Sequence, residues 1–150
     1  ISRSLLCKHH ERALMYGEDL TFQTPGKGLH EITQPLAECV RRADVETGLC
    51  QVFIRHTSAS LIITENADPS ARRDLIAWFE RQAPENHPDY THTSEGPDDM
   101  PSHLKAAITR TSECLPVKDG RLDLGTWQGV FIFEHRTRPH ERTISVRVQD

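Results

Sequence analysis

Gly48–His56 (GLCQVFIRH) is the stretch that decides the fold. Cys50, Val52 and Ile54 share one face of the strand that this stretch predicts, and Phe53 lies on the opposite face. Successive side chains of a strand alternate between its two faces, so both faces of this strand are apolar. A strand that is apolar on both faces is typical of the centre of a sheet. We therefore expect the rest of the domain to be built around it.

The segments around this strand predict further strands and three helices. Thr143–Val148 alternates apolar and polar residues, which indicates a strand with one buried face. Two short strands are expected within Glu18–Thr33, around a Pro-Gly turn. The other predicted strands are 61–63, 113–117, 122–124 and 129–136, and the predicted helices are 35–43, 69–83 and 102–109. Strands, then helices, then strands predict an α+β fold with a mostly antiparallel sheet.

Length and charge narrow the class of protein. The chain has 150 residues, which suits one domain, and we place that domain at 18–150 with an N-terminal extension at 1–17. The formal net charge is −4, which argues against a nucleic-acid binder. No apolar run is long enough to span a membrane. Because no hydrophobic signal segment is present either, we expect a cytoplasmic protein.

A polar break follows the central strand and is the first candidate site. His56, Thr57, Ser58 and Ser60 bring one imidazole and three hydroxyls between two apolar strands. Hydroxyls and backbone N–H groups in a turn are good phosphate ligands, so this break is a candidate phosphate site. The alternative is a turn held by its own side-chain to backbone hydrogen bonds.

A second polar segment precedes the predicted helix at 69–83. Asp68 followed by a proline is a typical helix cap. Glu65 and Asn66 are not needed for capping, which makes them the better functional candidates in this segment.

The long, proline-rich loop at 84–101 is the third candidate. It contains His92, and His103 follows it in the first turn predicted for the helix at 102–109. Asp98 and Asp99 lie between the two histidines and are available as caps. Imidazole and carboxylate groups are the ligands of divalent metals such as zinc and manganese. We therefore predict a metal site that uses His92 and His103, with His56 as the third ligand; the alternative is solvated loop histidines with acidic caps.

The fourth candidate lies near the C-terminus. Trp127 stands between two glycines and is placed to stack on an aromatic ring of a ligand, although a core or interface position is the alternative. Arg136, the last residue of the strand predicted at 129–136, is a candidate phosphate ligand.

Five linked motifs together resemble the YjbQ family, in order and over about Glu18 to Val148. They are His56–Ser60, Glu65–Pro69, Glu95–His103, Gly125–Gly129 and Glu134–Arg136. The resemblance implies an α+β domain with a mostly antiparallel, β-sandwich-like core that assembles as a homotrimer. It also implies a thiamine-phosphate synthase-like activity, in which a pyrimidine pyrophosphate and a thiazole phosphate are joined and pyrophosphate is released.

The candidate site residues, most of which are carried over from the resemblance, have expected roles. The catalytic set is His103, His56, Glu65 and Asn66; the substrate and phosphate set is Thr57, Ser58, Ser60, Trp127 and Arg136; the metal set is His92, His103 and His56. The expected cofactor is a divalent ion: zinc, manganese or magnesium. Two alternatives stay open, namely a metal-dependent hydrolase of a small phosphorylated substrate and a non-catalytic, ligand-binding trimer.

Overall fold

The computed structural model describes residues 15–150, which form an α+β domain. The strands are β1 (Tyr16–Thr24), β2 (Gly28–Glu31), β3 (Thr47–Ile54), β4 (Ala59–Glu65), β5 (Ser112–Lys118), β6 (Arg121–Leu122), β7 (Gln128–Glu134) and β8 (His140–Gln149). The helices are α1 (Thr33–Ala43), α2 (Pro69–Gln82) and α3 (Asp99–Ile108). The predicted fold class is thus confirmed. β1 begins at Tyr16, two residues before the expected domain start, and residues 1–14 of the predicted extension lie outside the described residues.

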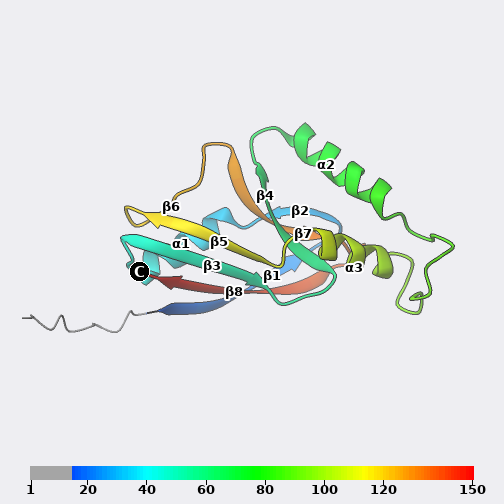
Figure 1. Cartoon of the computed structure of the whole chain (residues 1–150), viewed down its shortest axis with the longest axis horizontal. Helices are drawn as coiled ribbons and strands as arrows, with labels where there is room; N and C mark the ends of the chain where they lie inside the picture. Colours follow the sequence, from blue (N-terminus) through cyan, green and yellow to red (C-terminus); the bar gives the residue numbers. More distant parts are fainter. Residues whose placement is uncertain (1–14) are drawn as a thin grey trace, which may run out of the picture.

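The strands form two antiparallel sheets. The larger has the order β1-β8-β3-β5-β6, and the smaller has the order β2-β7-β4 (Figure 1). β3 pairs with both β8 and β5, which confirms the central position predicted from its two apolar faces. Phe53 on the outer face of β3 is nevertheless 45% exposed, because no element of the described chain covers that side.

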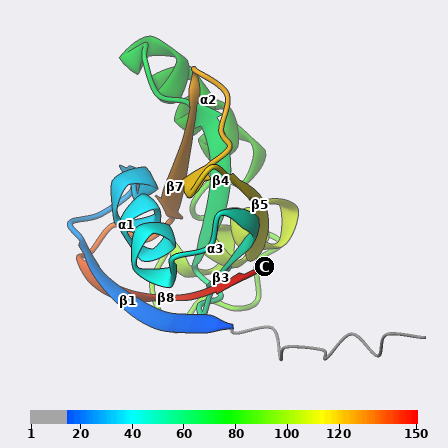
Figure 2. The same ribbon diagram turned by 90° about the vertical axis from the view of Figure 1, so that its left-hand side faces the viewer.

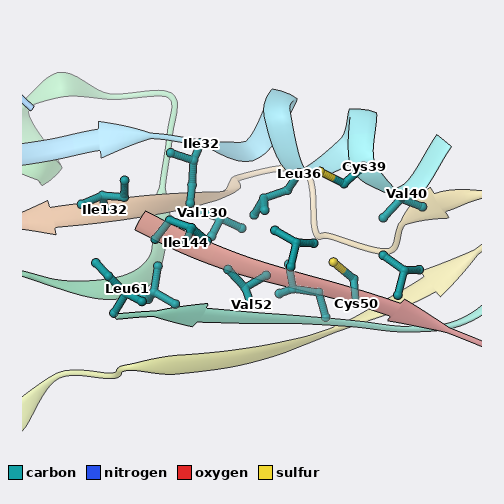
Figure 3. Close-up of a cluster of buried hydrophobic side chains, with 14 of the residues drawn as sticks. Ile32, Leu36, Cys39, Val40, Cys50, Val52, Leu61, Val130, Ile132 and Ile144 are labelled. Atoms are coloured by element: carbon teal, nitrogen blue, oxygen red, sulfur yellow. The ribbon is translucent and has the colours of Figure 1, made fainter. Parts of the chain in front are cut away.

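The hydrophobic core lies between the inner face of the larger sheet, the smaller sheet and α1. Leu36, Cys39 and Val40 on α1 point toward the side chains of β3 and β8 (Figure 3). Cys50 and Val52 from β3 are fully buried among them. Burying aliphatic side chains of this size stabilises the folded chain by about 1.5–3 kcal/mol each. The core therefore holds the larger sheet, α1 and the smaller sheet in one fixed arrangement.

The helix α2 lies on the far side of the molecule from the larger sheet (Figure 1, Figure 2). Asp68 caps it as predicted and accepts a hydrogen bond from the N–H of Ser70 at 2.8 Å. Within this helix, Phe79 is buried and Leu75 is only partly buried. Within residues 15–150, none of the helices combines the length and apolar character that a membrane crossing requires.

The helix α3 packs beside β4 and carries one end of the candidate site. A backbone hydrogen bond from Leu61 to Arg110 joins β4 to the segment after α3. Lys105 of α3 is fully buried and donates to Glu80 of α2 at 2.5 Å, so an ion pair also ties α3 to α2. These contacts fix α3 relative to the strands.

Candidate metal centre

Two imidazoles and a carboxylate converge where α3 begins. His92 comes from the loop between α2 and α3, and Asp99 and His103 lie four residues apart on one face of α3. The Nε2 atoms of His92 and His103 lie 2.8 and 3.2 Å from the same oxygen, Oδ2 of Asp99. One donor atom from each of the three residues fits within a group no more than 4.8 Å across.

A backbone carbonyl fixes the orientation of the His103 ring. Nδ1 of His103 lies 3.0 Å from the carbonyl oxygen of Thr57, in the turn between β3 and β4. A carbonyl oxygen only accepts hydrogen bonds, so Nδ1 carries the proton and Nε2 of a neutral ring has a free lone pair. Metal-binding histidines almost always donate their second N–H in this way. The arrangement therefore suits a cation placed between the two imidazoles and Asp99.

The carboxylate is held from its other side by an arginine. Asp99 is 2% exposed, and its Oδ1 accepts a hydrogen bond from Nη1 of Arg136. The same guanidinium donates to Asp98 and to the carbonyl oxygen of Glu95. The guanidinium of Arg136 is therefore engaged by three partners within the protein, and its predicted contact with phosphate stays a prediction.

The start of α3 depends on a tight turn. Gly96 has a φ of +110°, and a Cβ atom there would lie 3.3 Å from Asp98.

The carboxylate of Asp98 accepts hydrogen bonds from the N–H of Thr137 and from Arg136. Burial alone would raise the pKa of this carboxylate, but these hydrogen bonds lower it. Asp98 occupies the N-cap position, but its side chain makes no cap hydrogen bond. The predicted position of the cap is therefore confirmed, but the carboxylate of Asp98 bonds to Thr137 and Arg136 instead of to the helix.

His56 lies outside the group formed by His92, Asp99 and His103. Its Nε2 accepts the backbone N–H of Thr143 at 2.8 Å, so that atom is not available to a metal. Burial, together with the charge of Arg142, lowers the pKa of His56, and the neutral ring then carries its proton on Nδ1. The structure thus brings Asp99 to the two predicted ligands in the place where we expected His56.

The three hydroxyls of the polar break have different surroundings. Ser60 is fully buried, with Oγ 2.9 Å from Nε2 of His135, and Ser58 Oγ accepts a hydrogen bond from Arg142. Thr57 alone is exposed. Arg55, His56, Thr57 and Ser58 line a cavity of about 580 Å³ together with Phe53, Ile54 and Thr111. Of the three hydroxyls, the one on Thr57 is therefore the most open to a phosphate.

The remaining predicted site residues lie at the opposite end of β4. Glu65 ends this seven-residue strand, which is about 20 Å long at roughly 3.3 Å per residue. The N–H of Asn66 donates to the carbonyl oxygen of Trp127, whose side chain is 64% exposed. Glu65 and Trp127 line a separate cavity of about 520 Å³. Within one chain they are therefore not part of the group around Asp99.

The two buried cysteines do not contribute a reactive thiolate. Cys39 and Cys50 are fully buried free thiols. Burial raises the pKa of Cys39 to about 11 and that of Cys50 to about 12. Metal binding and nucleophilic attack both need the thiolate, so neither residue is suited to these roles.

The fold and the site define an α+β domain with a candidate metal centre of two histidines and one aspartate. Residues 18–150 match the family model described as UPF0047 protein YjbQ-like. The chain belongs to the YjbQ family, as the five motifs indicated.

Relatives and solved structures agree with this assignment. The UPF0047 protein sll1880 of Synechocystis is 53% identical over 87% of this chain and 89% of its own length. The YjbQ protein of Escherichia coli O157:H7 is 41% identical over 91% of this chain and 99% of its own. A conserved hypothetical protein of Thermus thermophilus has a TM-score of 0.79 at 34% identity, covering 87% of this chain and 98% of its own. The fold is thus shared with this solved structure.

Proposed function

We propose that the chain is a divalent-metal-dependent enzyme that acts on a small phosphorylated substrate. The observation that carries this proposal is the convergence of His92, Asp99 and His103, with the His103 tautomer fixed by the Thr57 carbonyl. Two nitrogen donors and one oxygen donor suit zinc or manganese better than magnesium, which prefers oxygen ligands alone. Three protein ligands also leave a coordination position for a substrate, as in catalytic rather than structural zinc sites.

The reaction that we propose is thiamine-phosphate synthesis. In this reaction the ring nitrogen of the thiazole phosphate attacks the methylene carbon of the pyrimidine pyrophosphate; the carbon–oxygen bond breaks and pyrophosphate leaves with the electron pair. No covalent protein nucleophile is needed. A divalent ion supplies charge neutralisation for the departing pyrophosphate.

The chain's own residues have clear tasks in this proposal. His92, Asp99 and His103 hold the ion. In the adjoining cavity, the Thr57 hydroxyl and the Nδ1–H of His56 donate hydrogen bonds to phosphate oxygens. Both groups are neutral donors, and each such hydrogen bond contributes about 0.5–1.5 kcal/mol, more when the acceptor is charged.

We also propose that the chain works as a homotrimer. The support is the family resemblance together with large apolar side chains on the surface, among them Leu49, Phe53 and Trp127. Exposed apolar groups of this kind often mark contacts between subunits.

Zinc and manganese titrations of metal-stripped protein test the metal centre. We expect one ion per chain in the wild type and a large loss of affinity in His92→Ala and His103→Ala, because each removes a ligand. His87→Ala is the matched control, since His87 is exposed on the same loop and lies outside the group. Equal affinity in all four proteins would refute the assignment.

An activity assay separates the synthase from a hydrolase. Wild-type protein with both half-substrates and the ion should form thiamine phosphate, and His103→Ala should not. Release of phosphate or pyrophosphate from one half-substrate alone would favour the hydrolase. No product under any metal would remove the synthase assignment.

A further inference from the structure

A buried ion pair joins the two sheets and is connected to the candidate metal centre by hydrogen bonds. Glu134 ends β7 in the smaller sheet, and Arg142 belongs to β8 in the larger. Their side chains are 0% and 4% exposed. Nε of Arg142 donates to Oε2 of Glu134 at 2.6 Å and Nη2 donates to Oε1 at 2.5 Å, while the hydroxyl of Thr24 also donates to Oε2 at 2.6 Å. Two parallel hydrogen bonds of this kind fix both side chains in one geometry.

One branch of hydrogen bonds runs from this pair to His103. Nη2 of Arg142 lies 3.2 Å from the hydroxyl oxygen and 3.4 Å from the carbonyl oxygen of Ser58. Ser58 directly follows Thr57, whose carbonyl oxygen receives the Nδ1–H of His103. Arg142 thus restrains the turn that selects the His103 tautomer.

A second branch runs from the pair to Asp99. Oε1 of Glu134 accepts the backbone N–H of Arg136 at 2.9 Å, at the start of the loop after β7. The guanidinium of Arg136 in turn donates to Oδ1 of Asp99, which leaves Oδ2 directed at the two imidazoles. Glu134 thus restrains the residue that orients the carboxylate.

We infer that Glu134 and Arg142 are positioning residues that orient His103 and Asp99 for metal binding. This inference rests on the proposed metal centre. Neither residue touches the site itself: Glu134 acts on Asp99 through Arg136, and Arg142 acts on His103 through Ser58 and Thr57. Loss of such outer partners typically lowers metal affinity 10- to 100-fold. An ion pair that served only to join the sheets would change stability and leave the affinity of the folded protein unaltered.

Calorimetric titration with zinc alone tests this inference on Glu134→Gln and Arg142→Lys. We expect both folded variants to bind zinc about 10- to 100-fold more weakly than the wild type. Val148→Ala is the matched control, because Val148 is fully buried at the far end of the same strand as Arg142. It should lose stability and keep the wild-type affinity.

Nitrogen NMR of the imidazoles in metal-free protein provides a readout that needs no metal. The wild type should show His103 with its proton on Nδ1 alone, and the variants should show a mixture of tautomers. Should Glu134→Gln not fold, Arg142→Lys carries the test, since it keeps the positive charge but loses the paired hydrogen bonds.

The outcomes separate the two proposals. A wild type that binds no zinc refutes the metal centre, and the NMR measurement then decides the positioning role alone. A wild type that binds zinc, with unchanged affinity and an unchanged His103 tautomer in both variants, refutes the positioning role and leaves the metal centre standing.

Discussion

His135 makes the fold sensitive to acid. Its ring is 1% exposed, with Nε2 beside the Ser60 hydroxyl, and its Nδ1 has no hydrogen-bond partner within the described residues. Burial lowers the pKa of His135 to about 3; the charge of Lys105 adds to this effect, Glu134 opposes it and Arg142 adds a smaller contribution. The ring is therefore neutral in the folded protein at neutral and mildly acidic pH.

The sign and size of the effect follow from proton linkage. In the unfolded chain a histidine has a pKa near 6.5, so between about 6.5 and 3 the unfolded state binds a proton that the folded state does not. The stability that the neutral His135 ring contributes is fully present above pH 6.5 and falls by up to about 1.4 kcal/mol per pH unit below it. Over the whole interval the loss reaches about 5 kcal/mol, which is a large share of the free energy of unfolding of about 5–15 kcal/mol that is usual for a domain.

Urea unfolding between about pH 7.5 and pH 5 measures this loss. The His135→Gln variant keeps a polar group near Ser60 but cannot titrate, so its free energy of unfolding should depend less steeply on pH by roughly 1 kcal/mol per unit. His87→Gln is the control, because that ring is exposed in the folded chain as in the unfolded one. His56, whose pKa is also lowered, contributes equally to all three proteins. Parallel pH profiles for the wild type and His135→Gln would refute the reasoning.

Three further predictions concern the fold, the cavity and the assembly. In Gly48→Ala, the new Cβ would lie 2.0 Å from the carbonyl oxygen of Gln149, so urea unfolding should show a loss of at least about 2 kcal/mol; a smaller loss would mean that β3 and β8 separate readily. Thr57→Val should weaken binding of inorganic phosphate up to about tenfold by calorimetry. Ser60→Ala should lower stability and keep the wild-type affinity for phosphate. Weaker phosphate binding in Ser60→Ala, with unchanged binding in Thr57→Val, would place the phosphate elsewhere. Light scattering should give about three times the chain mass of 17.1 kDa, and a stable monomer at micromolar concentration would contradict the trimer.

The apolar patterns were sufficient to predict the strands and the start of α2, while the starts of α1 and α3 were placed too late. The alternation in β8 and the apolar faces of β3 appear in the structure as predicted. We expected helices to begin at Pro35 and Ser102, but they begin at Thr33 and Asp99. The reason is the same in both: a proline is tolerated anywhere in the first helical turn, where the N–H groups have no partner within the helix. Each helix therefore begins before its proline.

This shift of the helix start explains why the third member of the metal group was missed. With the helix expected from Ser102, Asp99 was a loop residue and a cap, and His103 belonged to the first turn. In the structure Asp99 and His103 are four residues apart on the same helix, which places their side chains side by side. His103 is then beyond the first turn, and its ring is oriented by the Thr57 carbonyl.

The roles of the polar residues could not be predicted, because they depend on partners across the sheets. Sequence shows that Ser58, Ser60 and Arg136 are polar, but their hydrogen bonds go to Arg142, His135 and Asp99. Each of these pairs joins segments between 37 and 84 residues apart. Local patterns hold no information about such pairings. Two of the three hydroxyls predicted to bind phosphate are consequently used to hold the fold.

Hydrogen bonds to distant residues also offer an explanation for the buried ion pair of Glu134 and Arg142. Removing two charges from water costs several kcal/mol per ion, and a well-packed apolar pair would often stabilise a fold as well or better. Stability alone is therefore a weak explanation for Glu134 and Arg142. A role in orienting His103 and Asp99 is a different explanation, because an apolar pair cannot donate a hydrogen bond to Ser58 or accept one from Arg136. The double variant Glu134→Leu, Arg142→Met replaces the ion pair by apolar side chains and should thus fold. Even where its stability equals that of the wild type, it should bind zinc more weakly.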